Sequence, residues 1–256
     1  MTTLKRFAWE IWLPIALLVL WWIVSANSTD FYWPPLSDIM ADFGKLWIFD
    51  HLVEDAMPSV IRLTIGFVIA TVVAVTIGLL LGAFPRLEDA TRPIVEILRA
   101  TPGVALLPIM MLLFGTADAM KVLTIALVAT WPILLNTIDG VRSVEPVLHD
   151  VATSYRLTWL DRIRFITLPA ATPNIFAGMR TALSVAVVAM VVTEMVGAPG
   201  GIGYFILDSQ RNFNITSMWT GIIALGVIGY LVNKGFAALE GIVLSWHRGM
   251  MQHQED

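Results

Sequence analysis

With 256 residues, of which 57% are hydrophobic and only 14% charged, the chain is far more apolar than a water-soluble domain of average composition. It contains no cysteine, which excludes disulfides, thiol catalysis and thiolate metal sites. The formal net charge of -4 is too small to indicate a class of partner. The composition therefore predicts an all-α, polytopic membrane protein.

Six apolar segments are long enough to cross a bilayer as helices. They cover residues 7–26, 59–84, 94–114, 120–140, 174–196 and 217–245. The first also has the pattern of a secretory signal, since basic residues precede it and it ends in Val24-Ser25-Ala26. Its Trp-rich run reaches the length of a full span, which favours a retained helix. We divide the chain into an N-terminal region (1–58), a core of five spans (59–248) and a tail (249–256).

The distribution of basic residues predicts the orientation of these spans. If Lys5 and Arg6 lie inside, eleven of the 16 Lys and Arg residues fall in inner segments, four in outer segments and Lys234 within a span. Cytoplasmic segments of membrane proteins carry an excess of Lys and Arg. Both termini are therefore expected in the cytoplasm. Lys234 has two open interpretations, a side chain that reaches the interface or a salt bridge inside the bundle.

The polar segment before the second span contains apolar residues at helical spacing between Ser37 and Phe49. This spacing predicts a helix at the outer surface, either as a packing element or as a docking site for a partner. In the second span, Gly78 and Gly82 lie four residues apart, which favours close approach of another helix. Pro173 and Asn174 are typical of a helix start and predict where the fifth span begins.

Four residues within the predicted spans are candidates for a solute pathway or gate. Pro102 and Pro108 interrupt the segment 94–114, so its backbone must be kinked or locally unwound. Asn136 is a polar residue inside the fourth span, and Glu194 is the only carboxylate of the fifth. A structural role stays open for each: a kink, a hydrogen bond to a neighbouring helix, or contact with headgroup water at the outer end.

Several kinds of chemistry have no motif in this sequence. There is no G-x-x-x-x-G-K-[ST] stretch to hold ATP, and the four histidines lack zinc-site spacing. Intramembrane Asp, Glu and His are too few for a proton relay. An ion-coupled secondary transporter or a membrane enzyme fits the hydropathy, but the expected internal repeats and converging polar residues are missing.

A charged segment, Asp150 to Pro169, separates the fourth and fifth spans and must lie in water. Apolar residues recur every four positions along it: Val147, Val151, Tyr155, Trp159 and Ile163. On a helix they form one stripe backed by polar residues. An amphipathic helix outside the bilayer predicts a surface on which another protein packs.

The same segment resembles the cytoplasmic loop of permease subunits of bacterial ATP-binding-cassette (ABC) importers. That loop reads E-A-A, three residues, G, nine residues, then I-x-L-P. Here Asp150, Val151 and Ala152 take the places of the triplet, Arg156 takes the place of the glycine, and the motif closes with Ile166, Leu168 and Pro169. Three further stretches resemble the nitrate, taurine and sulfonate branch of these permeases: Leu98 to Gly115, Trp131 to Pro146 and Thr193 to Tyr204. The resemblance covers residues 59–248.

This resemblance implies the permease subunit of a type I importer in the bacterial inner membrane. It implies a homodimer of permeases, two ATPase subunits that hold ATP and Mg, and an extracytoplasmic binding protein that delivers a sulfonate, nitrate or carboxylate type of anion. The chain itself would need no cofactor or metal, would not be an enzyme and would bind no nucleic acid. The residues implied in coupling to the ATPase are Asp150, Val151, Ala152, Tyr155, Arg156, Trp159, Ile166, Leu168 and Pro169. No solute-binding residue follows from the resemblance.

Arg156 is the sharpest departure from the pattern. Glycine turns the chain with positive φ at little cost, and arginine resists that conformation. Either the loop bends with negative φ, or a helix runs on from Asp150 through Arg156. Since Val151, Tyr155 and Trp159 share a face only on a continuous helix, the pattern favours continuity.

Overall fold

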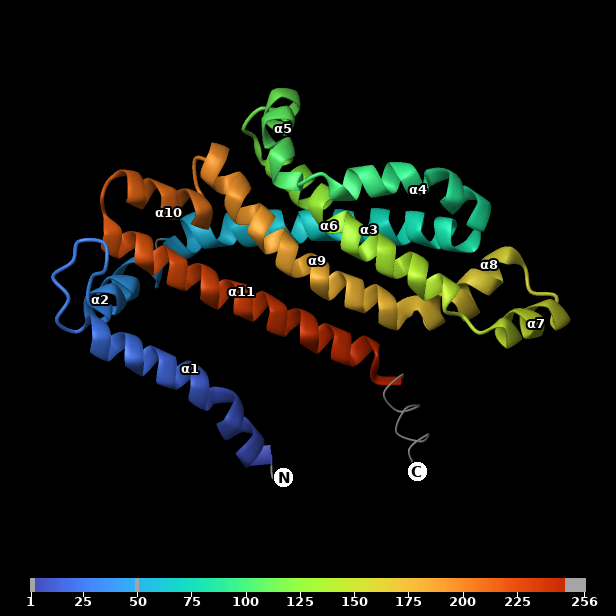
Figure 1. The fold of residues 1–256 in the computed structure, drawn as a ribbon, viewed down its shortest axis with the longest axis horizontal. Helices are drawn as coiled ribbons and strands as arrows, with labels where there is room; N and C mark the ends of the chain where they lie inside the picture. Colours follow the sequence, from blue (N-terminus) through green and yellow to red (C-terminus); the bar gives the residue numbers. More distant parts are fainter. Residues whose placement is uncertain (1–2, 49–50, 247–256) are drawn as a thin grey trace.

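The computed structural model describes the backbone of residues 3–48 and 51–246, and the side chains of these residues from Trp12 onward except His149. The described residues form helices and turns, without strands. Four helical segments are long and apolar enough to cross a membrane: 52–83, 118–142, 159–197 and 215–243. A bent pair of helices, 85–100 and 103–114, makes a fifth if it is counted as one span. Figure 1 shows the long helices running side by side along the longest axis of the molecule.

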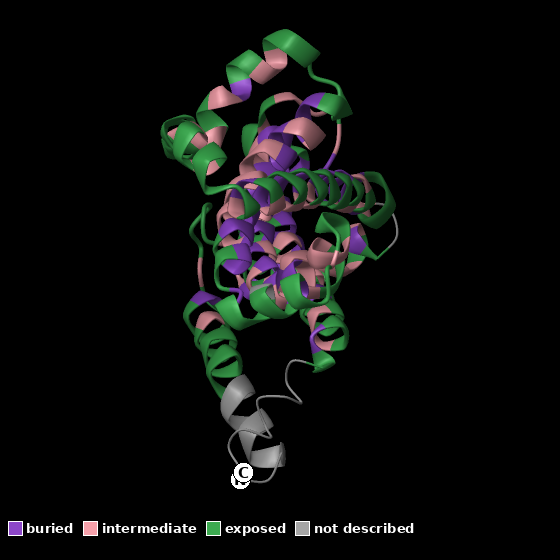
Figure 2. Cartoon of the chain, turned by 90° about the vertical axis from the view of Figure 1, so that its right-hand side faces the viewer, coloured by how far each residue is buried: buried purple, intermediate pink, exposed green. Residues whose placement is uncertain are grey.

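The core is built by α3 (Met57–Ala83), α6 (Asp118–Arg142) and α9 (Leu168–Gly197). Helix α6 lies between the other two and makes extensive contacts with both. Its interfaces are filled by alanines and a few larger residues, among them Ile125, Ile133 and Met190. Buried residues gather in this middle layer, as Figure 2 shows. Small side chains let helix backbones approach closely, which replaces the hydrophobic driving force that helices lack inside lipid.

Glycines along α3 set its distance from α6. A Cβ atom added at Gly78 would lie 2.6 Å from the Cβ of Thr137, and one at Gly82 would lie 2.6 Å from the Cβ of Val141. Gly66 makes the same kind of contact with Ile125. The predicted close approach at Gly78 and Gly82 is therefore confirmed, and α6 is the helix that approaches.

The predicted third span is broken into separate helices. Helix α4 (Pro85–Ala100) runs back along the core, a 3₁₀ turn η2 (Gly103–Leu106) follows, and α5 (Leu107–Phe114) projects away at the top of Figure 1. The axes bend by 84° at the break. The predicted start after Pro93 is wrong: α4 begins at Pro85, and Pro93 lies inside it. The interruption expected at Pro102 is confirmed, since the helix ends there and Pro102 has an extended ψ of 115.

One end of the molecule is closed by shorter helices. Helix α2 (Leu36–Trp47) and α10 (Ile202–Arg211) pack on α11 (Ile215–Val243) there, and the π-helical turn η1 (Leu52–Ala56) contacts α10. The predicted helix within 37–49 is confirmed by α2, and it packs on α11. Trp47 is buried and donates a hydrogen bond from Nε1 to the hydroxyl of Thr220 over 3.0 Å. Helix α10 had no counterpart in the sequence analysis.

The opposite end carries α7 (Pro146–Ser154), α8 (Trp159–Arg162) and the π-helical turn η3 (Ile163–Thr167), which leads into α9. These helices project at the right of Figure 1, beyond the end of α6. The predicted continuous helix through Arg156 is wrong, because α7 ends at Ser154. The fifth span begins before Pro173, which lies inside α9.

Helix α1 (Thr3–Ser25) lies beside the bundle and contacts mainly α2. Its described side chains, from Trp12 to Val24, are largely exposed and apolar. The part of the predicted first span before Trp12 lies outside the described side chains, and the tail 249–256 lies outside the described residues.

Candidate coupling and pathway sites

The turn after α7 takes the glycine conformation in spite of its arginine. Arg156 has φ 51. Its N–H donates to the carbonyl of Thr153, and the N–H of Leu157 donates to the carbonyl of Ala152, each over 3.0 Å. These two bonds form a Schellman motif, in which the left-handed residue is usually glycine. Arg156, which stands where the importer loops have glycine, thus has a backbone conformation that favours glycine. The chain forms two short helices here and not the one continuous helix that the apolar stripe predicted.

Helix α8 starts with a side-chain cap and packs on the corner between α3 and α4. The hydroxyl of Thr158 accepts a hydrogen bond from the N–H of Asp161. The ring of Trp159 stacks on Phe84, with ring centroids 6.4 Å apart. Phe84 is the residue between α3 and α4. Trp159 therefore links this end of the molecule to the start of α4.

Three apolar side chains of α7 and its turn stand exposed beyond the spans. Val147, Val151 and Tyr155 follow one another every four residues, and 78% of Tyr155 is exposed. Leu160 adds a fourth exposed residue from α8. We call these four residues the α7–α8 surface. Among the coupling candidates, Ala152 is buried and Asp150 is exposed.

The closing I-x-L-P motif joins the projecting helices to α9. Ile166 lies in η3, while Leu168 and Pro169 form the first turn of α9, and all three are half-buried. The proline suits this turn because the first helical positions need no N–H donor. The motif therefore joins α8 and η3 directly to the longest helix of the core.

At the other end, Glu194 lies at the centre of a buried polar network. It has 0% exposure. Its carboxylate accepts hydrogen bonds from the Ser59 hydroxyl at 2.7 and 2.8 Å, from the Arg62 guanidinium at 2.9 Å and from the N–H of Gly203 at 3.1 Å. A solute cannot touch this carboxylate in the present conformation. A buried charge is tolerable only when it is paired and hydrogen bonded, and here both conditions hold.

The same network caps the start of α10 from outside the helix. The N–H of Gly201 donates to Asp55, that of Ile202 donates to Ser59, and that of Gly203 donates to Glu194. The first N–H groups of a helix have no partner within the helix. Here side chains from η1, α3 and α9 satisfy three consecutive ones. Gly201 has φ 125, and a Cβ there would lie 2.5 Å from the Glu194 carboxyl carbon, so only glycine fits.

Two buried cations share a second carboxylate. Arg62 donates from Nε to Asp118 over 2.8 Å, and the Lys121 ammonium lies 3.2 Å from the same oxygen. Lys121 is 1% exposed and also donates to the carbonyl of Thr116. The sequence analysis counted Arg62 and Lys121 among the four outer basic residues, and the structure places them near the starts of α3 and α6. One sequence signal for this site was Asp118, which lies three residues before Lys121 in the same predicted region.

The other pathway candidates have local structural roles, and Asn136 also packs against α9. Pro108 stands in the first turn of α5, where it starts a helix. Asn136 donates to the carbonyl of Pro132 in its own helix over 2.8 Å, and its Cβ lies where a side chain at Gly178 of α9 would go. Pro102 accepts the N–H of Ala105 and forms the break between α4 and η2. Only Pro102 therefore changes the course of the chain.

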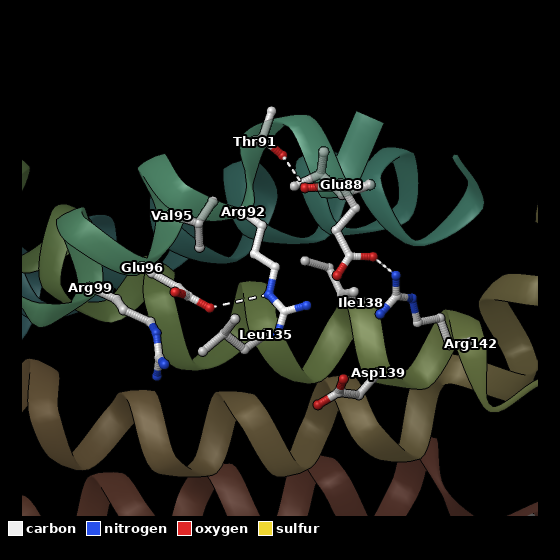
Figure 3. A pocket seen from close by; sticks show the side chains of 11 residues that line it. Glu88, Thr91, Arg92, Val95, Glu96, Arg99, Leu135, Ile138, Asp139 and Arg142 are labelled. Carbon is white, nitrogen blue, oxygen red and sulfur yellow. Dashed lines mark hydrogen bonds and ion pairs between the residues drawn. The ribbon is translucent and has the colours of Figure 1, made fainter. Parts of the chain in front are cut away.

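A polar cavity of about 290 Å³ lies between α4 and α6. Figure 3 shows a row of charged side chains that reaches from α4 toward α6. The lining includes three arginines and three carboxylates: Arg92, Arg99, Arg142, Glu88, Glu96 and Asp139. Within the described residues, no group of three or more His, Cys, Asp or Glu side chains could hold a metal ion. We call this cavity the α4–α6 cleft.

Comparison with known proteins relates these sites to a family. Residues 74–243 match the family described as binding-protein-dependent transport system inner membrane component. The chain is 31% identical over 246 residues to the aliphatic sulfonates transport permease of Bacillus subtilis, covering 94% of this chain and 89% of that one. It is 33% identical over 186 residues to the nitrate import permease of Synechocystis, covering 73% of this chain and 68% of that one.

A solved structure has the same fold. A chain of the MetNI methionine ABC transporter, in an inward-facing conformation, superposes with a TM-score of 0.68 at 20% identity. The match covers 77% of this chain and 97% of that one. The family match, the two permeases and this fold lead to one conclusion. The chain belongs to the binding-protein-dependent transport system inner membrane components, in their nitrate, taurine and sulfonate branch, and is a permease subunit of an ABC importer.

Proposed function

We propose that two copies of this chain form a pathway across the bacterial inner membrane for a small anion of the sulfonate, nitrate or carboxylate type. The similarity to permeases for aliphatic sulfonates and for nitrate supports this solute class. An extracytoplasmic binding protein delivers the anion. ATP and Mg are held by two separate ATPase subunits, because this chain has no phosphate-binding loop.

The observation that carries the coupling proposal is the α7–α8 surface. Exposed Val147, Val151 and Tyr155 belong to α7 and the turn after it, between the candidate membrane spans 118–142 and 159–197. Exposed apolar clusters in water mark protein interfaces. The ATPase therefore docks at this end, which faces the cytoplasm together with both termini. Trp159 and the I-x-L-P motif carry its movement to α4 and α9.

Tyr155→Asp tests this docking surface. The substitution places a charge in an apolar contact and is expected to reduce copurification of the ATPase about tenfold or more. Trp159→Asp is less informative, because it also removes the stacking on Phe84. Ile48→Asp, an exposed apolar residue at the opposite end, is the matched control and is expected to keep the complex intact. Equal recovery of the ATPase with both variants would refute docking at this surface.

The solute class is tested with the binding protein of the same system. Calorimetry with sulfonates, nitrate and carboxylates is expected to detect one tight anionic ligand. Proteoliposomes with the full complex should then accumulate that anion only when ATP is supplied on the ATPase side. A binding protein that takes only cations or peptides would overturn the solute assignment. Uptake driven by an ion gradient without ATP would instead indicate the secondary transporter that the hydropathy alone allows.

A further inference from the structure

Helix α4 has its polar face turned inward. Glu88, Arg92, Glu96 and Arg99 line the α4–α6 cleft, whereas the apolar side chains of Leu87, Ile94 and Leu98 are exposed on the other side. This is the reverse of a surface helix in water, whose apolar face packs on the core. A helix with lipid or a second permease outside and water inside has this pattern. The cleft is therefore a hydrated space within a membrane-spanning unit.

The charges in the cleft leave one cation without a partner. Arg142 pairs with Glu88, and Arg92 pairs with Glu96 over 3.2 Å. In the described part of the chain, Arg99 has no ion pair, although it lines the same cavity. Figure 3 shows Arg99 at one end of the row, with Glu88, Asp139 and Arg142 at the other. The end of the cleft next to Arg99 is consequently positive.

This positive end lies deep along the helix. Arg99 is eleven residues from Glu88 on α4, a rise of about 16 Å, roughly half the thickness of the hydrocarbon core. It stands one turn before the break at Pro102. An arginine at such a depth is costly without a counter-charge, and such residues mark ion and substrate pathways.

We propose that the α4–α6 cleft is the half of the solute pathway next to the ATPase, and that Arg99 is the residue that binds the passing anion there. The ligand class is a small oxyanion whose two oxygens fit the guanidinium fork. The pairs Arg142–Glu88 and Arg92–Glu96 balance one another's charges, and Asp139 adds a negative charge at the far end of the cleft, so the anion meets one positive site and then leaves. This inference rests on the importer function proposed above.

The absence of cysteine from the chain allows a direct test. Val95 lines the cleft one turn from Arg99, so Val95→Cys places a single thiol beside it. The complete transporter, reconstituted in liposomes, is treated from the ATPase side with two methanethiosulfonate reagents, one bearing a sulfonate and one a trimethylammonium group. Their reaction rates with the thiol of this chain are measured and divided by their rates with free 2-mercaptoethanol.

The normalised preference for the anionic reagent is expected to be about tenfold, since a positive cleft concentrates anions. It should vanish when Arg99→Gln is added, and persist when Arg86→Gln is added. Arg86 lies on the same helix but does not line the cleft. Ile94→Cys, on the exposed apolar face, should react slowly with both reagents.

Two results would overturn the assignment: a Val95→Cys thiol that neither reagent reaches, or an anionic preference that Arg99→Gln leaves unchanged. The measurement uses defined reagents and does not depend on the natural solute. If the binding protein proved to carry a cation, the solute class would fall while the rate ratio still reported on the cleft. The two proposals can therefore fail separately.

Discussion

Arg156 holds a backbone conformation that costs a residue with a side chain about 1–2 kcal/mol. Arg156→Gly keeps the two main-chain bonds of the turn and removes this strain. We expect it to raise the free energy of unfolding by up to about 1 kcal/mol, since the greater freedom of glycine in the unfolded chain offsets part of the gain. Transport should be retained. Thermal unfolding of the purified complex and uptake by proteoliposomes measure the two effects.

Two comparisons make this prediction specific. Arg156→Val should lower stability, because β-branched residues disfavour positive φ. Arg164→Gln removes a nearby exposed charge without changing the turn. If Arg156→Gly released the ATPase and Arg164→Gln did not, the Arg156 guanidinium itself would make the contact, contrary to our expectation.

Ser59 serves two partners in the network around Glu194. It donates to the carboxylate and accepts the N–H of Ile202 at 3.0 Å, and it is fully buried. Ser59→Ala leaves both groups short of a partner, so we expect a loss of about 1–3 kcal/mol in the free energy of unfolding. Ser37→Ala, at an exposed position of α2, should change stability very little. Similar unfolding temperatures for the two variants would contradict a stabilising role of the network.

At the scale of elements, the break between α4 and α5 depends on one close contact. A Cβ atom at Gly103 would lie 2.2 Å from a methyl carbon of Val128, and no other atom of that side chain would come closer than 3.4 Å. Gly103→Ala is expected to lower the free energy of unfolding by about 1–3 kcal/mol, because η2 must move away from α6.

A second substitution in the same contact is expected to restore part of the lost stability. Val128→Ala removes the clashing methyl group, so the double variant should be more stable than the sum of the two single effects predicts. A double-mutant cycle on thermal unfolding measures this coupling. Strictly additive effects would mean that another contact fixes the break.

At the scale of the whole molecule, α5 starts against α6 and then projects from the core. Leu112 is 85% exposed and Leu113 is 66% exposed, at the end of an element that projects from the bundle. We expect this element to pack on a second copy of the chain. Two differently tagged copies should copurify, and Leu112→Ala with Leu113→Ala should weaken their association about tenfold. Ile23→Ala, on exposed α1, is the control. Purification of only one tag would indicate a different permease as the partner.

The sequence predicted what hydropathy and spacing can report. The correct predictions each used a signal that lies within one segment of the chain. They are the spans at α3, α6 and α11, the helix α2, the interruption at Pro102 and the close approach at Gly78 and Gly82. The Schellman turn was missed because the stripe of Val151, Tyr155 and Trp159 fits a continuous helix equally well. The network around Glu194 was missed because it joins residues such as Ser59 and Ile202, which are 143 positions apart.

The wide separation of these residues along the chain also determines the order in which the network assembles during synthesis. Arg62 pairs with Asp118, which lies 56 residues further along the chain, and with Glu194, which lies 132 residues further along. During synthesis, α3 enters the membrane with an unpaired guanidinium, which lipid does not accept without cost. Its first partner comes with α6, and the network is complete only when α9 and α10 have followed. The closed end of this permease is therefore completed late, and a chain released before α9 would lack Glu194 and leave Arg62 with Asp118 as its one carboxylate partner in the network.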